Sequence, residues 1–474
     1  MSVAKNTTWM TIASVGQKII AFAYFAMIAR FLGTELTGRY TTVLAFTTIV
    51  VVFVDLGLST VLVREVARAK EKAQTYLSTV LATKIVLAIL AYLGLIVLAY
   101  LFGYDSEYRL MLYISGMTML FDSLHLSLYA VLRGYGVLKY EAVGVLMSQA
   151  LTLILGGLAL YFALPLVYLI AAFTISSAMN VLYVRRILKE KYHISIRPIF
   201  KKDIFYHIAR IAVPFAFAAI FARVYSYIDG LMLKHMLGDS AAGIYAVPMK
   251  INFAFQFIPF ALVASLYPRM SEYFTTNKER LATIFHQGII YLGIIVLPIA
   301  VGIGLLARDI VLLIYTDTYI DSILPLQILM GGLFFFFMSF PIGACLNACN
   351  RQKTQTIIAG VVMLVNIGLN MVLIPIYGIV GAAVAAVAGN ILLVLFGVYI
   401  VRQVVRISGL YLLKKFIQMG IAVVTMGVVV NMLSGSVSLL MSIVVGALVY
   451  LLMLFVTKAV EPRQIEEITA LIRG

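Results

Sequence analysis

The sequence predicts an all-α integral membrane protein of about fourteen transmembrane helices. Of its 474 residues, 63% are apolar and only 12% are charged, and the mean hydropathy is +1.04, which lies outside the range of soluble globular chains. Apolar runs of about 20 residues recur from end to end, each long enough to cross roughly 30 Å of hydrocarbon. The alternating pattern of barrel strands is missing, so the spans are predicted to be helices.

Charged residues, glycine, proline and asparagine mark the breaks between the apolar runs. The first run begins almost at Met1, has Lys18 at its centre and lacks a small-residue cleavage pattern, so it is predicted to be a retained helix rather than a signal peptide. The fourteen predicted spans lie near residues 8–30, 40–63, 77–101, 110–132, 141–164, 166–184, 211–233, 243–267, 283–307, 322–346, 354–374, 379–401, 412–433 and 437–457.

Lysine and arginine residues are distributed unevenly over the predicted loops. With the N-terminus placed in the cytoplasm, 27 of them fall on the inner side and 5 on the outer side, as the positive-inside rule requires. An even number of spans then places both termini in the cytoplasm. The net charge of +16 is largely a consequence of this topology, so a nucleic-acid partner is not expected.

A short motif, glycine followed by four residues and then Gly-x-Tyr, occurs twice in the chain. The motif and two further coincidences share an offset of 205 residues, and these five matches support duplication of a six-helix block over chance similarity. The domains are predicted to be residues 1–200 (N-lobe), 201–405 (C-lobe) and 406–474 (two additional helices). The coincident pairs are Gly33 with Gly238, Gly38 with Gly243, Tyr40 with Tyr245, Lys18 with Arg223, and Arg64 with Arg269.

Among the ionisable residues inside the predicted spans, seven are singled out, because each is costly in lipid and must face protein, water or substrate. The depth of each charged group in the membrane follows from its distance to the nearest helix end, at about 1.5 Å per residue. Groups of opposite charge lie at similar depths in three pairs: Asp55 with Lys84, Asp122 with Lys18, and Asp229 with Lys250. Arg223, near the midplane, is then left over, and a bound anion would complement its buried charge. The alternative is that the charges form structural ion pairs. The predicted substrate-binding residues are Lys18, Arg223, Lys250, Arg30 and Tyr227.

Other features limit the chemistry. Asp122 and His125 are spaced i, i+3 on one helical face and are a candidate proton carrier, although a hydrogen-bonded structural role fits the same spacing. The sequence holds no phosphate-binding loop for a nucleotide, and no cofactor or metal is predicted. Cys345 and Cys349 are interpreted as small packing residues.

Several segments resemble the polysaccharide-transport branch of the MOP flippase superfamily, which includes Wzx-type flippases and is related to MurJ and MATE transporters. These segments are ARFLGTELTGRY at 29–40, DLG at 55–57, RE at 64–65, LRGYG at 132–136, IDGLMLKHMLGDSAAGIY at 228–245 and LNMVLIPIYGIVGAAVAAV at 369–387.

The resemblance implies a cell-membrane flippase with two six-helix lobes in a V, which moves a polyprenyl-linked oligosaccharide outward by alternating access through a cationic cavity. It also implies glycan-assembly enzymes and membrane lipids as partners, with a proton or sodium ion as the coupling ion if there is one. A MATE-like exporter of small molecules is the main alternative. A membrane enzyme of polysaccharide assembly is less favoured because the outer loop 308–321 offers aspartates without a partner base.

Overall fold

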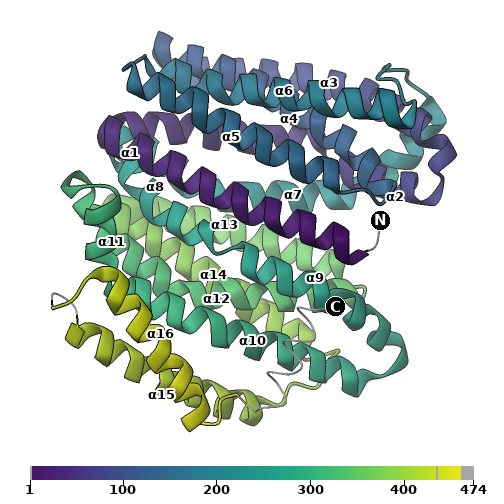
Figure 1. Ribbon diagram of the computed structural model, residues 1–474. Helices are drawn as coiled ribbons and strands as arrows, with labels where there is room; N and C mark the ends of the chain where they lie inside the picture. The colour runs from purple at the N-terminus through teal and green to yellow at the C-terminus, as the bar shows by residue number, and fades with distance from the viewer. Residues whose placement is uncertain (1–2, 434–435, 461–474) are drawn as a thin grey trace. The chain divides into compact units, whose positions relative to one another are not determined.

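The computed structural model describes residues 3–433 and 436–460, and within these ranges it is helical, with short connections and no strands (Figure 1). Its helices are α1 Val3–Asp55, α2 Leu58–Arg68, α3 Ala73–Leu101, α4 Ser106–Gly134, α5 Lys139–Tyr161, α6 Leu166–Tyr192, α7 Lys202–Leu237, α8 Asp239–Ala254, α9 Phe257–Thr276, α10 Lys278–Leu305, α11 Ala307–Ile314, α12 Ile323–Ala348, α13 Gln352–Tyr377, α14 Ile379–Val401, α15 Gly409–Leu433 and α16 Leu439–Val456. Residues 1–2 and 461–474 lie outside the described residues, and so does the predicted placement of both termini.

The helices account for all fourteen predicted spans. Twelve helical segments of the described chain are long and apolar enough to cross a membrane. One of them includes most of α1, which has 53 residues and would extend about 80 Å at 1.5 Å per residue, far more than one bilayer crossing. Its backbone leaves the helical conformation at Gly33, so α1 contains the first predicted span and most of the second, which continues into α2. The more polar α4 supplies the fourth, and the all-helical fold class is confirmed.

The chain divides into two compact units, residues 1–243 and 244–474. In the first, α4 packs against α6, α2, α3 and α1, and α7 packs against α1 and α2. In the second, α12 packs against α14 and α10, and the last two helices, yellow in Figure 1, lie side by side. The units are defined by packing and the predicted lobes by duplication, so the boundaries at 200 and 405 remain predictions. Cys345 and Cys349 are buried and free.

The two copies of the repeated glycine motif pack directly against each other. The first glycine of each copy has a positive φ, 73° at Gly33 and 94° at Gly238, a conformation that glycine adopts without strain. The second glycine of each copy allows close approach: a Cβ on Gly38 would lie 1.8 Å from the Asp239 carbonyl oxygen, and one on Gly243 would lie 1.9 Å from that of Thr34. The repeat therefore builds a glycine-to-glycine contact between the two hairpins.

This contact predicts a large effect of one methyl group. Gly38→Ala is expected to destabilise the protein by about 1–3 kcal/mol, because the new Cβ overlaps backbone atoms that cannot move aside as a side chain would. Thermal unfolding of the purified variant in detergent measures the change. Gly94→Ala in α3 is the matched control, since a Cβ at that glycine meets nothing within 4 Å. Equal stability of the two variants would contradict the packing described.

The tyrosines of the motif are buried. Tyr40 is 3% exposed and Tyr245 is 1% exposed, and the head-group level that their aromatic rings favour stays a prediction. The Tyr40 ring lies beside Phe173, with ring centroids 6.4 Å apart. Helix rotation turns these side chains into the protein interior, so their role in the motif is packing.

A charged cluster joins the same two hairpins. Asp239, which directly follows Gly238, lies 3.0 Å from the Lys234 ammonium and 3.6 Å from Nε of Arg39. The Arg39 guanidinium also lies 3.4 Å from Asp105 at the start of α4. Arg39 and Lys234 are two of the five cations predicted on the outer side. The cluster thus links the middle of α1 to the start of α4, the end of α7 and the start of α8, through charge as well as glycine packing.

Candidate functional site

A polar cavity of about 510 Å³ lies within the first unit. Its walls come from α1, α4, α5, α6 and α7, and they carry serine, threonine, asparagine and glutamine side chains together with a few ionisable groups. Polar groups at membrane depth are costly unless they face protein, water or a ligand. The cavity is therefore the candidate site. Its ionisable lining residues are Asp55, Asp122, His125 and Arg223.

The structure brings Asp55 and Lys84 together at one wall of the cavity. The Lys84 ammonium donates to Asp55 at 2.5 Å, to the Ser59 hydroxyl at 3.0 Å and to the Ser123 carbonyl oxygen at 3.0 Å. Ser59 also donates to Asp55. The Lys84 side chain is 5% exposed and that of Asp55 is 20% exposed. All three ammonium hydrogens are thus used within the protein, and the pair is electrically balanced.

A second acidic group, Asp122, faces the cavity from α4. Nε2 of His125 lies 3.1 Å from its carboxylate, as the i, i+3 spacing predicts for one helical face, and Ser177 of α6 donates to the same oxygen. The Asp122 side chain is 47% exposed, so it is accessible from the cavity. This carboxylate has two neutral or titratable partners rather than the lysine that depth matching suggested for it.

Arg223 lines the cavity from α7 and is exposed. Its charge acts on Lys18 of α1, which is half-buried, so the two cations that the repeat aligns lie near each other. Because like charges repel, this arrangement favours a bound anion between or beside them. The predicted partner of Asp122, Lys18, is thus nearer to a cation than depth matching suggested, and the binding roles of Lys18 and Arg223 stay predictions.

The remaining candidates occupy other positions. Arg30 on α1 is exposed, Tyr227 on α7 is half-buried, and Asp229 on α7 is 2% exposed. Lys250 belongs to the second unit and is half-buried there. The pairing of Asp229 with Lys250 joins the two units and therefore stays a prediction, as do the binding roles of Arg30 and Tyr227.

Sequence analysis missed most of the uncharged polar lining. One pattern in the sequence could have predicted this lining. On α4, polar residues recur at intervals of three, four and three positions, at Ser115, Thr118, Asp122 and His125, which places them on one face of the helix. Gln17, beside Lys18, also lines the cavity. Ser177 reaches Asp122 from a different helix, so no spacing within the sequence could have connected the two.

The helical topology is that of a multi-pass membrane protein, and a polar cavity lies among its helices. The family model described as "Polysaccharide biosynthesis protein" matches residues 3–274, and the chain belongs to this family. The MatE model matches residues 214–372, as expected for a member of the MOP superfamily.

Individual proteins agree with this assignment. The chain is 24% identical to a "Putative O-antigen transporter" of Shigella flexneri, over 81% of this chain and 94% of that protein. It is 21% identical to the capsular polysaccharide biosynthesis protein CapF of Staphylococcus aureus, over 80% and 94% of the two chains. Its fold resembles that of the lipid II flippase MurJ, with a TM-score of 0.77, 18% identity and coverage of 94% and 97%.

Proposed function

We propose that the protein is a flippase that moves a polyprenyl-(pyro)phosphate-linked oligosaccharide from the cytoplasmic to the outer leaflet by alternating access. The main support for this proposal is the polar cavity among the helices, which is lined by the Arg223 guanidinium. The chain also belongs to the polysaccharide biosynthesis family. A guanidinium can hold a phosphate through two parallel hydrogen bonds. The named relatives, an O-antigen transporter and a lipid II flippase, support a cargo of this class.

The cationic character of the site rests on a small number of groups. Lys84 offsets Asp55, so Arg223 and nearby Lys18 supply the positive charge facing an anionic head group, and Lys250 and Arg30 are proposed to add to it. Moving one or two phosphate charges through hydrocarbon without such groups is prohibitively costly. The protein would lower this cost by replacing water around the phosphate with fixed charges.

The orientation proposed is the one with both termini and the 185–210 segment in the cytoplasm. Cysteine substitutions at Lys201 and Asp317, labelled with an impermeant thiol reagent in intact cells, test it. The Asp317 position is expected to react and the Lys201 position is not. The reverse pattern would overturn the orientation.

In cells that make the glycan, depletion of the protein tests the proposed cargo. Lipid-linked oligosaccharide is expected to accumulate on the cytoplasmic face and the surface glycan to fall. Unchanged surface glycan together with a normal pool of lipid-linked intermediate would contradict the proposal.

A small-molecule exporter is the second candidate, because two carboxylates, Asp55 and Asp122, line the cavity. Carboxylates suit cationic cargo and proton exchange. Asp55 is already neutralised by Lys84, which leaves Asp122 as the one accessible anion among the ionisable lining residues named above. Arg223 and Asp122 then carry one accessible charge of each sign, so the preference for the flippase rests on the named relatives.

Asp122 and His125 are proposed to couple transport to a proton gradient. The carboxylate is accessible from the cavity and lies within hydrogen-bonding distance of a histidine, so a proton can be held between them. Asp122→Asn is expected to retain cargo binding but to make transport in vesicles insensitive to an imposed pH gradient. Ser148→Ala, on another wall of the same cavity, is the control. A full response of the Asp122→Asn variant to the gradient would exclude this coupling site.

A further inference from the structure

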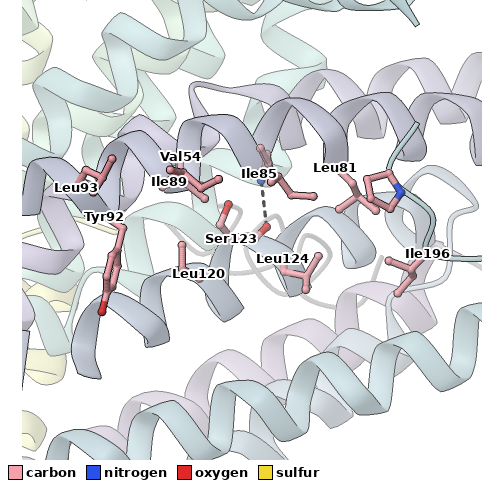
Figure 2. A pocket seen from close by; sticks show the side chains of 13 residues that line it. Val54, Leu81, Ile85, Ile89, Tyr92, Leu93, Leu120, Ser123, Leu124 and Ile196 are labelled. Atoms are coloured by element: carbon pink, nitrogen blue, oxygen red, sulfur yellow. Dashed lines mark hydrogen bonds between the residues drawn. The ribbon is translucent and has the colours of Figure 1, made fainter. Parts of the chain in front are cut away.

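A second cavity of about 460 Å³ lies between α3 and α4, and it is apolar. The α3 wall includes Ile85, Ile89 and Leu93, which are 48%, 56% and 52% exposed, so this wall is open to the surroundings. In Figure 2, Tyr92 lies at one end of this groove and Ile196 at the other, with Leu120 and Leu124 on the α4 side. From Leu81 to Leu93 the groove extends about 18 Å along α3.

The polar groups at the groove are engaged by the protein. The Lys84 ammonium at its floor is held by Asp55, Ser59 and the Ser123 carbonyl oxygen, and the Tyr92 hydroxyl donates to the Tyr113 carbonyl oxygen at 3.1 Å. The remaining lining is mainly aliphatic. A head group would therefore find no charged partner inside the groove, whereas a hydrocarbon chain would find continuous apolar contact.

One end of the groove is capped by a basic segment. Ile196 and Pro198 line the groove, and they belong to the linker between α6 and α7, residues 193–201. The linker is fixed to the start of α3, because Gln74 exchanges two hydrogen bonds of 2.7 Å with the Ser195 backbone. Arg197 lies between these two lining residues and is exposed, and Lys201 and Lys202 follow as exposed cations of the same segment, against one carboxylate between residues 194 and 206, Asp203.

We propose that this groove is a loading site for a single-chain anionic lipid, a polyprenyl phosphate, whose chain lies between α3 and α4 and whose phosphate lies against the basic segment. The inference rests on the proposed function for the identity of the lipid. An apolar groove that ends at exposed cations is complementary to an apolar chain that ends at an anion. A phospholipid has two acyl chains, and a single groove accommodates one of them.

The groove also adjoins the polar cavity. Ser123 lines both, and Lys84 lines the groove while its partner Asp55 lines the cavity. A lipid loaded here is thus separated from the polar site by the Lys84 and Ser123 layer of the protein. The site stands outside the cavity and on the cytoplasmic side in the orientation proposed above, where the lipid-linked cargo is assembled.

A photocrosslinking experiment tests the loading site in the full-length protein. Ile89 and Leu90 are neighbours on α3 and are 56% and 60% exposed, but only Ile89 lines the groove. A photoreactive benzoylphenylalanine is placed at either position in protein reconstituted with radiolabelled polyprenyl monophosphate in excess phospholipid. Crosslinking to the polyprenyl lipid is expected to be at least several-fold greater at Ile89 than at Leu90. The double variant Arg197→Glu, Lys201→Glu is expected to reduce it several-fold.

The outcomes separate this inference from the proposed function. Equal labelling at Ile89 and Leu90, or labelling at Ile89 by phospholipid in place of the polyprenyl lipid, would overturn the loading site. If the two glutamate substitutions leave labelling at Ile89 unchanged, the proposed contact between the lipid phosphate and the basic segment is wrong. Because the probe carries no sugar and no transport is measured, selective labelling supports the site even if movement of a lipid-linked glycan fails in a separate assay.

Discussion

Arg223→Ala and Arg223→Glu are expected to abolish movement of the lipid-linked glycan while the folded protein remains in the membrane. Arg223 is exposed and lines the polar cavity, so its removal leaves no buried carboxylate of the cavity without a partner. What is lost is the bidentate contact to phosphate, and with it the neutralisation of the cargo during crossing. Arg223→Lys is expected to retain part of the activity, because a point charge persists without the fork geometry.

Surface glycan measured in cells, together with the amount of protein in the membrane, gives the result. Arg210→Ala is the matched control, since Arg210 is an exposed arginine on the same helix and is not among the residues lining the cavity. Full export by a well-expressed Arg223→Glu variant would show that Arg223 does not bind the cargo. Loss of protein from the membrane in the Arg223→Ala variant, reversed by a second change at Asp229, would indicate a structural role instead.

The second large effect concerns stability. Lys84→Met is expected to lower the free energy of unfolding by about 3–5 kcal/mol, because it leaves the Asp55 carboxylate in the protein interior without its countercharge. Asp55→Asn in the same chain should recover much of this loss, since the neutral amide needs no countercharge. Chemical denaturation of the purified protein, followed by circular dichroism, compares the two variants.

An exposed ion pair provides the control for this prediction. Arg186 and Glu190 lie 2.8 Å apart, with side chains 76% and 53% exposed, and such pairs are worth about 0–1 kcal/mol. Arg186→Met should therefore have little effect. Wild-type stability of the Lys84→Met variant would show that the ion pair contributes little and that Asp55 finds another partner.

The sequence predicted the elements that depend on local pattern. Hydropathy alone marked the spans, and Gly33 marked the break within α1, because a residue with φ of 73° interrupts a helix wherever it lies. Depth along the helices was sufficient to suggest Asp55 with Lys84, since both groups lie near the same level and few other charges do. The i, i+3 spacing likewise placed Asp122 beside His125.

Features that depend on helix rotation and on contacts between distant segments could not be predicted in this way. Depth matching suggested Lys18 for Asp122, but the carboxylate contacts His125 and Ser177, and Lys18 lies near Arg223. Depth gives the level of a side chain and not its direction.

The charged cluster at the hairpins shows a further limit. Arg39 was counted only as one of the few outer cations, because positive-inside reasoning treats loop charges as topology signals. Its contacts to Asp105 and Asp239 join segments about 70 and 200 residues away. Such a cluster follows from the glycine-to-glycine contact, which becomes evident only once the two copies of the motif are seen to pack together.

Transport by the purified protein in sealed proteoliposomes tests the central claim most directly, because the cargo distinguishes a flippase from an exporter. A radiolabelled polyprenyl-diphosphate oligosaccharide is placed in one leaflet, and its arrival in the other is measured with a membrane-impermeant glycosidase. Uptake of a fluorescent organic cation is followed in parallel. The account predicts that the oligosaccharide crosses in a manner that requires Arg223 and that the cation does not accumulate. Accumulation of the cation without movement of the oligosaccharide would contradict it.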